Sequence, residues 1–291
     1  MKEKTPIVVF GEALFDCFPS GQNILGGAAF NVAWHLQALG DNPRFISCVG
    51  NDGLGQKVLT AMTDWGMDTQ SIQIDPIHQT GQVEVDLIEN EPHYNITPDC
   101  AYDFISQDGM GQLPDRGILY HGTLGVRNNI SRDCLEYITK QSNLSVFLDV
   151  NLRSPWWQKQ AVFEWLQQAR WVKLNESELQ QLGFVSTDIC EAMHRLLTQF
   201  QLEQLIVTRG EKGVVVLEEN GNLFQETPAP VDGIIDTVGA GDGFSAVFIH
   251  GLITGRPIAE VLNIAQEFAG KVITLRGATT KDHVFYQEFL S

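Results

Sequence analysis

The sequence lacks any apolar run that approaches the roughly 18 residues of a membrane-spanning helix. The run from Ile7 to Phe10, close to the start, is too short for the hydrophobic part of a signal peptide. No CxxC pair occurs among the five cysteines, so we expect free, buried thiols in a reducing compartment. These absences argue against a membrane partner and predict a cytoplasmic location.

Basic residues are scarce. The 291 residues include 19 Lys and Arg against 36 Asp and Glu, and the formal net charge is −17. A surface this negative repels a polyphosphate backbone, so nucleic acid is not an expected partner. A small anion such as a nucleotide stays possible, because a local group of backbone N–H groups can outweigh distant charges.

Two familiar signals of chemistry are missing as well. The chain has no GxxxxGK[ST] loop, which excludes the Walker type of nucleotide site. Its seven histidines show neither HxxxH nor HxH spacing, so a zinc site is not expected. There is also no internal repeat and no linker, and we expect residues 1–291 to form a single domain.

What the sequence does contain is an alternation of strand and helix patterns. This alternation predicts an α/β fold with a mostly parallel sheet and helices on both faces. Expected strands cover 7–10, 45–49, 145–150, 171–174 and 205–208, and a hairpin joins 214–217 to 222–225. Expected helices cover 28–39, 55–65, 156–169, 189–200, 243–253 and 258–275.

One stretch departs from this pattern. From Gly81 to Ile88 apolar and acidic residues alternate, and a turn at 90–92 leads to a second strand over 93–96. A half-exposed antiparallel hairpin inside a parallel protein suggests a small inserted lid, built from about 12–23 and 81–104. The alternative is an edge hairpin without a function.

The sharpest motif is the run DTVGAGD from Asp236 to Asp242, with strand-like Ile234-Ile235 before it and an apolar helix after it. Glycines at such a turn let backbone N–H groups point at one spot, and the helix N-terminus adds positive potential. An acidic residue in an anion site suits a base that takes a proton from a nucleophile. Asp242 could instead be an N-capping residue of a tight turn.

This run resembles the C-terminal signature of the ribokinase-like (PfkB) carbohydrate kinases. Four more segments resemble motifs of that family and precede it in the family's order. They are GGAAFN at 26–31 (GGxxxN), GNDGLG at 50–55 (GxDxxG), NESE at 175–178 (NxxE) and TRGEKG at 208–213 (TxGxxG). The resemblance extends from Gly11 to Ala278 and implies the ribokinase-like fold. Within the family, GEALFD at 11–16 and DVNLR at 149–153 look like the fructokinase branch, although relatives more often have proline where Val150 stands.

The resemblance implies a role for each matching position. Asp242 would be the general base, and the N–H groups of Gly239, Ala240 and Gly241 would form the anion hole. Asp16, Gly27 and Asn31 match positions that hold the sugar. On their own residues, Asp16 could be a plain loop residue and Asn31 a buried helix polar group.

The nucleotide side is matched by a second group of positions. Asn175 and Glu178 resemble the magnesium and phosphate pair, with Mg²⁺ held through water, and Arg153 is a candidate phosphate contact. Asn175 and Glu178 could equally cap a helix start, and Arg153 could be a surface residue. Asp236 matches a monovalent cation position, often for K⁺, and Gly277-Ala278 is expected to line the same loop. Further nucleotide contacts are implied at Thr208, Gly210, Gly213 (otherwise a plain turn) and Asn263.

The sequence therefore predicts an ATP-dependent kinase that phosphorylates a primary hydroxyl of a small sugar, with fructose as the first choice. Ribose, 2-keto-3-deoxygluconate or a nucleoside are alternative acceptors, because few side chains decide between them. A non-catalytic sugar or nucleotide sensor on the same fold is a second alternative. A homodimer through the lid is a further implication of the resemblance.

Overall fold

The computed structural model describes residues 5–88 and 91–290. Its strands are β1 (Ile7–Phe10), β2 (Leu14–Cys17), β3 (Asn23–Gly26), β4 (Arg44–Gly50), β5 (Ile72–Asp75), β6 (Gly81–Ile88), β7 (Glu91–Ile96), β8 (Arg116–His121), β9 (Asn143–Asp149), β10 (Ala169–Asn175), β11 (Gln204–Thr208), β12 (Val214–Glu218) and β13 (Leu223–Glu226). Its helices are α1 (Ala28–Ala38), α2 (Gly53–Asp64), α3 (Asn129–Gln141), α4 (Lys159–Leu166), α5 (Glu176–Gln181), α6 (Ile189–Phe200), α7 (Ala240–Thr254), α8 (Ile258–Val272) and α9 (His283–Gln287). Short 3₁₀ helices are η1 (Ala101–Phe104), η2 (Leu124–Val126) and η3 (Gly210–Lys212).

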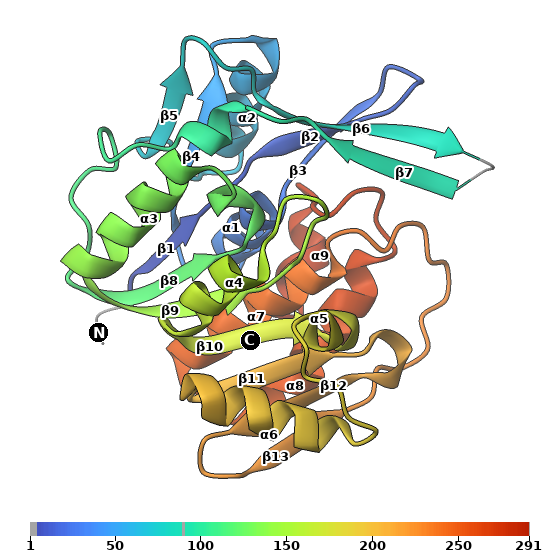
Figure 1. Ribbon diagram of the computed structural model, residues 1–291. Coiled ribbons are helices and arrows are strands. Elements are labelled where there is room, and N and C mark those ends of the chain that lie inside the picture. The colour runs from blue at the N-terminus through green and yellow to red at the C-terminus, as the bar shows by residue number, and fades with distance from the viewer. Residues whose placement is uncertain (1–4, 89–90, 291) are drawn as a thin grey trace.

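Two sheets organise the described residues. The large sheet has nine strands in the order β13-β12-β11-β10-β9-β8-β1-β4-β5. From β11 to β5 neighbouring strands are parallel. Strand β12 pairs antiparallel with both of its neighbours, β11 and β13. The small sheet, in the order β3-β2-β6-β7, extends away from the body of the molecule (Figure 1).

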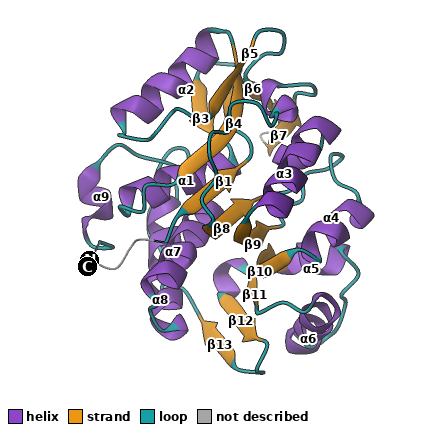
Figure 2. Cartoon of the chain, turned by 90° about the vertical axis from the view of Figure 1, so that its left-hand side faces the viewer, coloured by secondary structure: helices purple, strands orange, loops and turns teal. Residues whose placement is uncertain are grey.

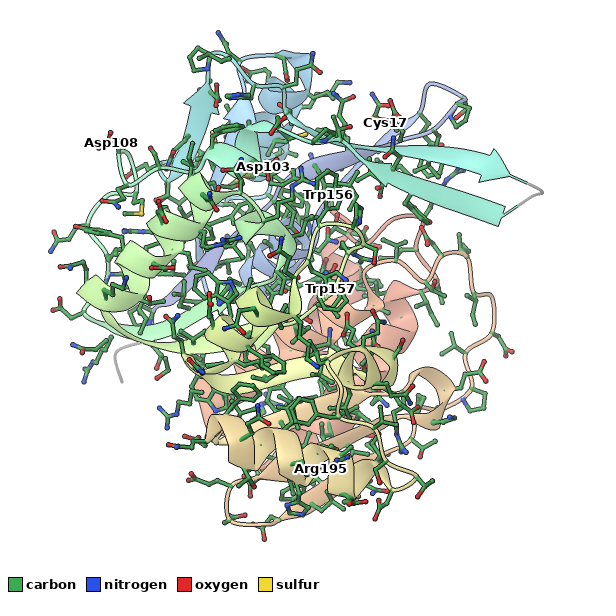
Figure 3. All side chains as sticks on the ribbon, viewed as in Figure 1. Cys17, Asp103, Asp108, Trp156, Trp157 and Arg195 are labelled. Carbon is green, nitrogen blue, oxygen red and sulfur yellow. The ribbon has the colours of Figure 1, made fainter. Side chains whose placement is uncertain are left out.

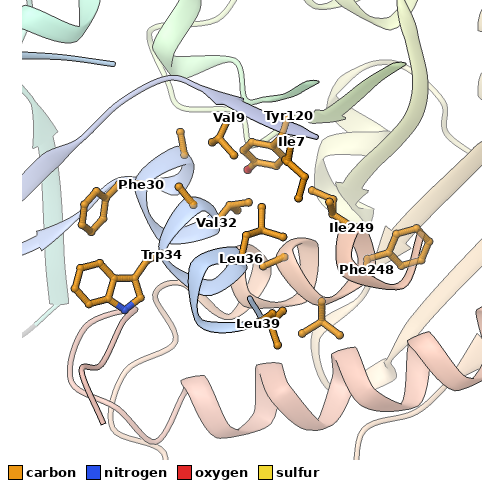
Figure 4. Close-up of a cluster of buried hydrophobic side chains, with 14 of the residues drawn as sticks. Ile7, Val9, Phe30, Val32, Trp34, Leu36, Leu39, Tyr120, Phe248 and Ile249 are labelled. Carbon is orange, nitrogen blue, oxygen red and sulfur yellow. The ribbon is translucent and has the colours of Figure 1, made fainter. Parts of the chain in front are cut away.

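Helices cover both faces of the large sheet (Figure 2). Successive residues of β1 face opposite sides, as the pleat of a strand requires. Ile7 and Val9 join the apolar cluster that contains residues of α1, α7 and α8, whereas Val8 and Phe10 join the cluster with α3, α4 and α6. Figure 4 shows the first cluster, in which α1 and α7 pack beneath β1. The predicted parallel α/β architecture is confirmed.

The predicted helix over 156–169 is wrong at both ends. Helix α4 covers Lys159–Leu166 only, and Ala169 already belongs to β10. Trp156 lies in a turn, where its N–H donates to the carbonyl of Arg153, and the guanidinium of Arg127 lies 4.3 Å from the Trp156 ring. Figure 3 shows Trp156 beside Asp103, the ion-pair partner of Arg127. The hydrophobic periodicity of one segment carries no information about a partner such as Arg127, which lies elsewhere in the chain.

Two further predictions need correction. Ile234 and Ile235 are not a strand: they are 56% and 64% exposed, and the N–H groups of Ile235 and Asp236 donate to the carbonyl of Ile273 after α8. An exposed connection, and not a strand of the sheet, therefore precedes the loop of residues 239–241, which is called the anion loop below. Helix α8 also ends at Val272, so the expected helix to 275 is too long, and α7 begins three residues earlier than expected.

The small sheet holds the predicted hairpin and more. β6 and β7 pair antiparallel, and β6 also pairs parallel with β2, which pairs antiparallel with β3. Residues 14–26 and 81–96 thus supply its strands, and η1 packs against β4 of the large sheet. All five cysteines are free, but Cys17 and Cys190 are only partly buried. In the described part of the chain, every helix is too short or too polar to cross a bilayer.

Candidate active site

The site residues gather at the carboxyl edge of the large sheet. Asp149, Asn175 and Thr208 are the last residues of β9, β10 and β11, which are neighbours in the sheet. This edge is where open parallel sheets bind ligands, because the connections to the following helices leave a crevice there. The start of α7 brings Asp242 to the same edge.

Asn31 and Asp242 meet directly. Asn31 lies in α1, and its Nδ2 donates a hydrogen bond of 2.8 Å to Oδ2 of Asp242 in the first turn of α7. Asn31 is 2% exposed, and its Oδ1 accepts no hydrogen bond from any residue that the structure describes. An unpaired buried amide oxygen is costly unless a donor reaches it. The structure therefore joins the N-terminal glycine motif to the C-terminal loop through one side chain.

The environment of Asp242 suits a base. Burial raises its pKa to about 6, and the negative charge of Asp149 acts in the same direction. The hydrogen bond from Asn31 and the charges of Lys173 and Arg153 oppose this rise. A carboxylate with a pKa near 6 is ionised at neutral pH and takes up a proton more readily than an ordinary aspartate.

The loop before Asp242 depends on glycine. Gly239 is the N-cap of α7 with φ of +82°, and a Cβ on it would lie 2.2 Å from Cβ of Ala278. The expected contact of this loop with Gly277-Ala278 is thus present. Gly243 N–H donates to Gly239 O, and the first N–H groups of α7 before it have no acceptor within the helix. Such groups, at the positive end of the helix dipole, are available to an anion.

Gly27 and Glu12 form the other side of the site. Gly27 has φ of +106°, and a Cβ on it would lie 2.8 Å from the carbonyl oxygen of Glu12. Oε1 of Glu12 accepts from the N–H of Ala28 at 3.0 Å, and Glu12 is 2% exposed. Burial raises the pKa of Glu12 to about 7, and the charge of Asp242 adds to the rise. Sequence reasoning gave Glu12 no role of its own, although an acid two residues after an apolar strand was a visible signal.

Asp16, Asp236 and Arg153 form a charged group on the side of the small sheet. Asp16 lies in β2, and burial, with the charge of Asp236 adding to it, raises its pKa to about 6 while Arg153 opposes the rise. Oδ1 of Asp236 accepts from the N–H of Val238, which shapes the start of the anion loop. The exposed Arg153 acts on the pKa of both Asp16 and Asp242.

Asn175 and Glu178 make a capping box at the start of α5. Oδ1 of Asn175 accepts from the N–H of Glu178, and Oε2 of Glu178 accepts from the N–H of Asn175. Oε1 of Glu178 accepts from the N–H of Leu152, and burial raises the pKa of Glu178. The structure thus shows the helix-capping arrangement that the sequence left open for Asn175 and Glu178. Each carboxylate oxygen keeps a second lone pair, which suits contact with Mg²⁺ through water.

The predicted nucleotide shelf lies beside β13. Thr208 ends β11, and Gly210 begins the short η3 turn that leads to β12. A Cβ on Gly213 would lie 2.0 Å from the carbonyl oxygen of Glu226, and the same carbonyl accepts a hydrogen bond from Gln266 of α8. Asn263, three residues before Gln266, is exposed on α8. Gly213 and Gln266 thus both lie against the Glu226 carbonyl, whereas the roles of Thr208, Gly210 and Asn263 in nucleotide binding stay predictions.

Lys173 and Asp149 are buried charges that sequence reasoning did not assign. Nζ of Lys173 lies 2.9 Å from Oδ2 and 3.1 Å from Oδ1 of Asp149, and Ser245 donates to Oδ2 at 2.8 Å. A lysine inside the apolar strand from Trp171 to Leu174 was the available signal. Within residues 5–88 and 91–290, no three His, Cys, Asp or Glu side chains gather closely enough to bind a metal by themselves.

A known protein family matches almost the whole chain. Residues 7–283 match the model of the pfkB family carbohydrate kinases. The chain belongs to this family. The family predicted from the motif order is confirmed, and with it a carbohydrate kinase on a ribokinase-like fold.

Relatives of this pfkB kinase include enzymes with different acceptors. It is 30% identical to the fructokinase of Klebsiella pneumoniae, over 94% of this chain and 95% of that one. It is 26% identical to the aminoimidazole riboside kinase of Salmonella typhimurium, over 96% and 92%. The crystal structure of the fructokinase of Vibrio cholerae O395, with fructose, ADP and calcium ion bound, superposes with a TM-score of 0.84 at 26% identity and covers 99% of each chain.

Proposed function

We propose that this kinase transfers the γ-phosphoryl group of ATP to a primary hydroxyl of fructose. The observation that carries the proposal is the position of Asp242. Asp242 lies in the first turn of α7, directly after the glycine loop whose N–H groups can bind an anion. Asn31 of α1 donates a hydrogen bond to its carboxylate. Fructokinases among the full-length relatives support fructose as the acceptor.

In this mechanism the Asp242 carboxylate takes the proton of the acceptor hydroxyl while the hydroxyl oxygen bonds to the γ-phosphorus. The bond from that phosphorus to the β,γ-bridging oxygen breaks, and ADP leaves with the bond's electron pair. A positioned base of this kind contributes about 10²–10⁴ in rate. The N–H groups of Gly239, Ala240 and Gly241 would hold the charge on the transferred group, and loss of one such donor costs about 10²–10³.

The remaining residues bind and orient. Asp16 and the free Oδ1 of Asn31 would accept hydroxyl hydrogens of the sugar, and Gly27 would let the ring approach the backbone. Arg153 would contact phosphate, and Thr208, Gly210, Gly213 and Asn263 the nucleotide. Glu178 and Asn175 would hold Mg²⁺ through water, and the ion would offset phosphate charge when bound. Asp236 would contribute to a K⁺ site.

The small sheet would act as a lid, because Asp16 is on its strand β2. Closure over the acceptor would exclude water and suppress wasteful ATP hydrolysis. The homodimer through this sheet stays a prediction, which sedimentation analysis of the full chain would check. A cytoplasmic location also stays part of the proposal, and the five free thiols suit a reducing compartment.

An ADP-release assay over a panel of acceptors tests the proposal. The panel holds fructose, ribose, glucose, 2-keto-3-deoxygluconate, adenosine and aminoimidazole riboside, each with ATP and Mg²⁺. We expect the highest kcat/KM for fructose and a phosphate ester on a primary carbon of the product. A higher kcat/KM for another acceptor would reject fructose as the substrate but would leave the kinase activity of the proposal unchanged. Binding of fructose and ADP by calorimetry, without phosphorylated product from any acceptor, would favour the sensor alternative.

A further inference from the structure

A buried ion pair lies directly behind the anion loop. Lys173 and Asp149 are register partners on the neighbouring strands β10 and β9, and their side chains are 9% and 2% exposed. The Lys173 ammonium donates to both carboxylate oxygens of Asp149, at 2.9 and 3.1 Å. An ion pair replaced by apolar side chains often leaves a protein as stable or more so. Stability alone therefore gives little reason for charges at this place.

The pair contacts the loop at two points. A Cβ placed on Gly241 would lie 2.9 Å from Nζ of Lys173, so the ammonium lies against the backbone of the anion hole. Ser245, one turn further along α7, donates to Oδ2 of Asp149 at 2.8 Å and lies 3.0 Å from the carbonyl oxygen of Gly241. The first turn of α7 is thereby fixed to two strands of the sheet.

We propose that Lys173 is a positioning residue for phosphoryl transfer. Held by Asp149, its ammonium fixes Gly241 and places a positive charge behind the N–H groups that receive the transferred phosphoryl group. The inference rests on the proposed role of the Gly239–Gly241 loop. It adds to the site a lysine from within β10, two residues before the end of that strand. Preorganised positive charge in a partly dry site acts most strongly on charge that develops during the reaction.

The charges around Asp242 make the proposal distinguishable from a purely structural role. Lys173 lowers the pKa of Asp242 and Asp149 raises it, so removing both takes away two opposing effects. The groups that face or act on Asp242 are Asn31 of α1, Glu12 after β1, Tyr120 of β8, Asp149 of β9, Arg153 after β9 and Lys173 of β10. All of them except Lys173 and Asp149 are unchanged in the variants below.

The decisive variant is the neutral pair Lys173→Met with Asp149→Asn, which leaves no unpaired buried charge. We expect a melting temperature close to that of the wild type and KM values for ATP and fructose within about threefold. We expect kcat to fall by about 30-fold or more, in line with loss of part of an anion hole, with the acid limb of the kcat profile displaced by less than about half a pH unit. A folded neutral pair with wild-type kcat would overturn the proposal.

Single variants and a control complete the experiment. Lys173→Met alone leaves Asp149 uncompensated, so the acid limb is expected to move to higher pH as well. If the neutral pair does not fold, Ser245→Ala tests the same link: kcat should fall several-fold with KM unchanged, and an unchanged kcat overturns the proposal. The matched control replaces His250 and Asp41, whose side chains are 2.8 Å apart in the second half of α7 and before β4, as His250→Gln with Asp41→Asn, and should keep wild-type kcat. Asp242→Asn in the same assay separates the two ideas, since its failure to lose turnover would reject the proposed base and not Lys173.

Discussion

The side-chain amide of Asn31 donates a 2.8 Å hydrogen bond to the carboxylate of Asp242, although 211 residues separate the two in sequence. A hydrogen bond to the charged form of an acid stabilises that form and lowers the pKa. Asn31 therefore orients the proposed base and counteracts the effect of burial on its pKa, in addition to the sugar contact proposed for its Oδ1.

Replacing Asp242 by Asn should abolish most turnover. Asparagine keeps the size of the side chain but cannot take the proton of the acceptor, so kcat should fall by about 10²–10⁴. The affinities for ADP and fructose, measured by calorimetry, should stay within about threefold. A variant that turns over at the wild-type rate would show that Asp242 is not the general base.

Proton uptake by Asp242 predicts the pH dependence of the wild type. Because its pKa in the protein without substrates is raised to about 6 and the base must be ionised, kcat/KM should be half-maximal near pH 6 and fall about tenfold per unit below it. Asn31→Leu removes the hydrogen bond to the ionised form and should move this acid limb to higher pH by about one to two units, since such a bond is worth about 1.5–3 kcal/mol. A profile of kcat/KM for fructose between pH 5 and 9 measures both. An unmoved limb in the variant would contradict the role given to Asn31.

Asp16 should govern acceptor affinity and not nucleotide affinity. Asp16→Ala removes a hydroxyl acceptor from the small sheet, and we expect the KM for fructose to rise at least tenfold with the KM for ATP within about twofold. Steady-state kinetics with each substrate varied in turn provide the measurement. Equal changes in both KM values would point to a general disturbance of β2 instead.

Glu12 should make the protein less stable as the pH rises. Its pKa is raised from 4.5 to about 7 in the folded protein, so the folded state binds the proton more tightly than the unfolded state. The stabilisation is complete below about pH 4.5 and is lost as the pH rises to about 7. Glu12→Gln cannot ionise, and its free energy of unfolding should exceed that of the wild type by up to about 3 kcal/mol at pH 8.

Denaturant titrations of the two proteins at pH 5 and pH 8 check this expectation. The difference between them should grow toward pH 8. A constant difference would mean that Glu12 is ionised in the folded protein throughout this range. Gln is the matched replacement, because its amide oxygen can still accept from the N–H of Ala28.

Local patterns predicted much of the fold. The helix from Ile189 to Phe200 was predicted to the residue, and strand positions such as Ile7 to Phe10 were also correct. Prediction failed where partners come from elsewhere in the chain. Trp156 is not helical, because its ring packs on the distant Arg127, and Ile235 is held by the end of α8 and not by a sheet.

The sequence by itself determined the family, through the order of its motifs along the chain, and singled out Asp242 as the candidate base, because an acid among glycines before an apolar helix is a local pattern. Only the tertiary structure decided which groups surround that acid. Asn31 reaches it from α1, and Lys173 and Asp149 lie behind its loop on β10 and β9. These contacts follow from sheet order and helix packing, since residues far apart in sequence become neighbours only when parallel strands align their carboxyl ends at one edge.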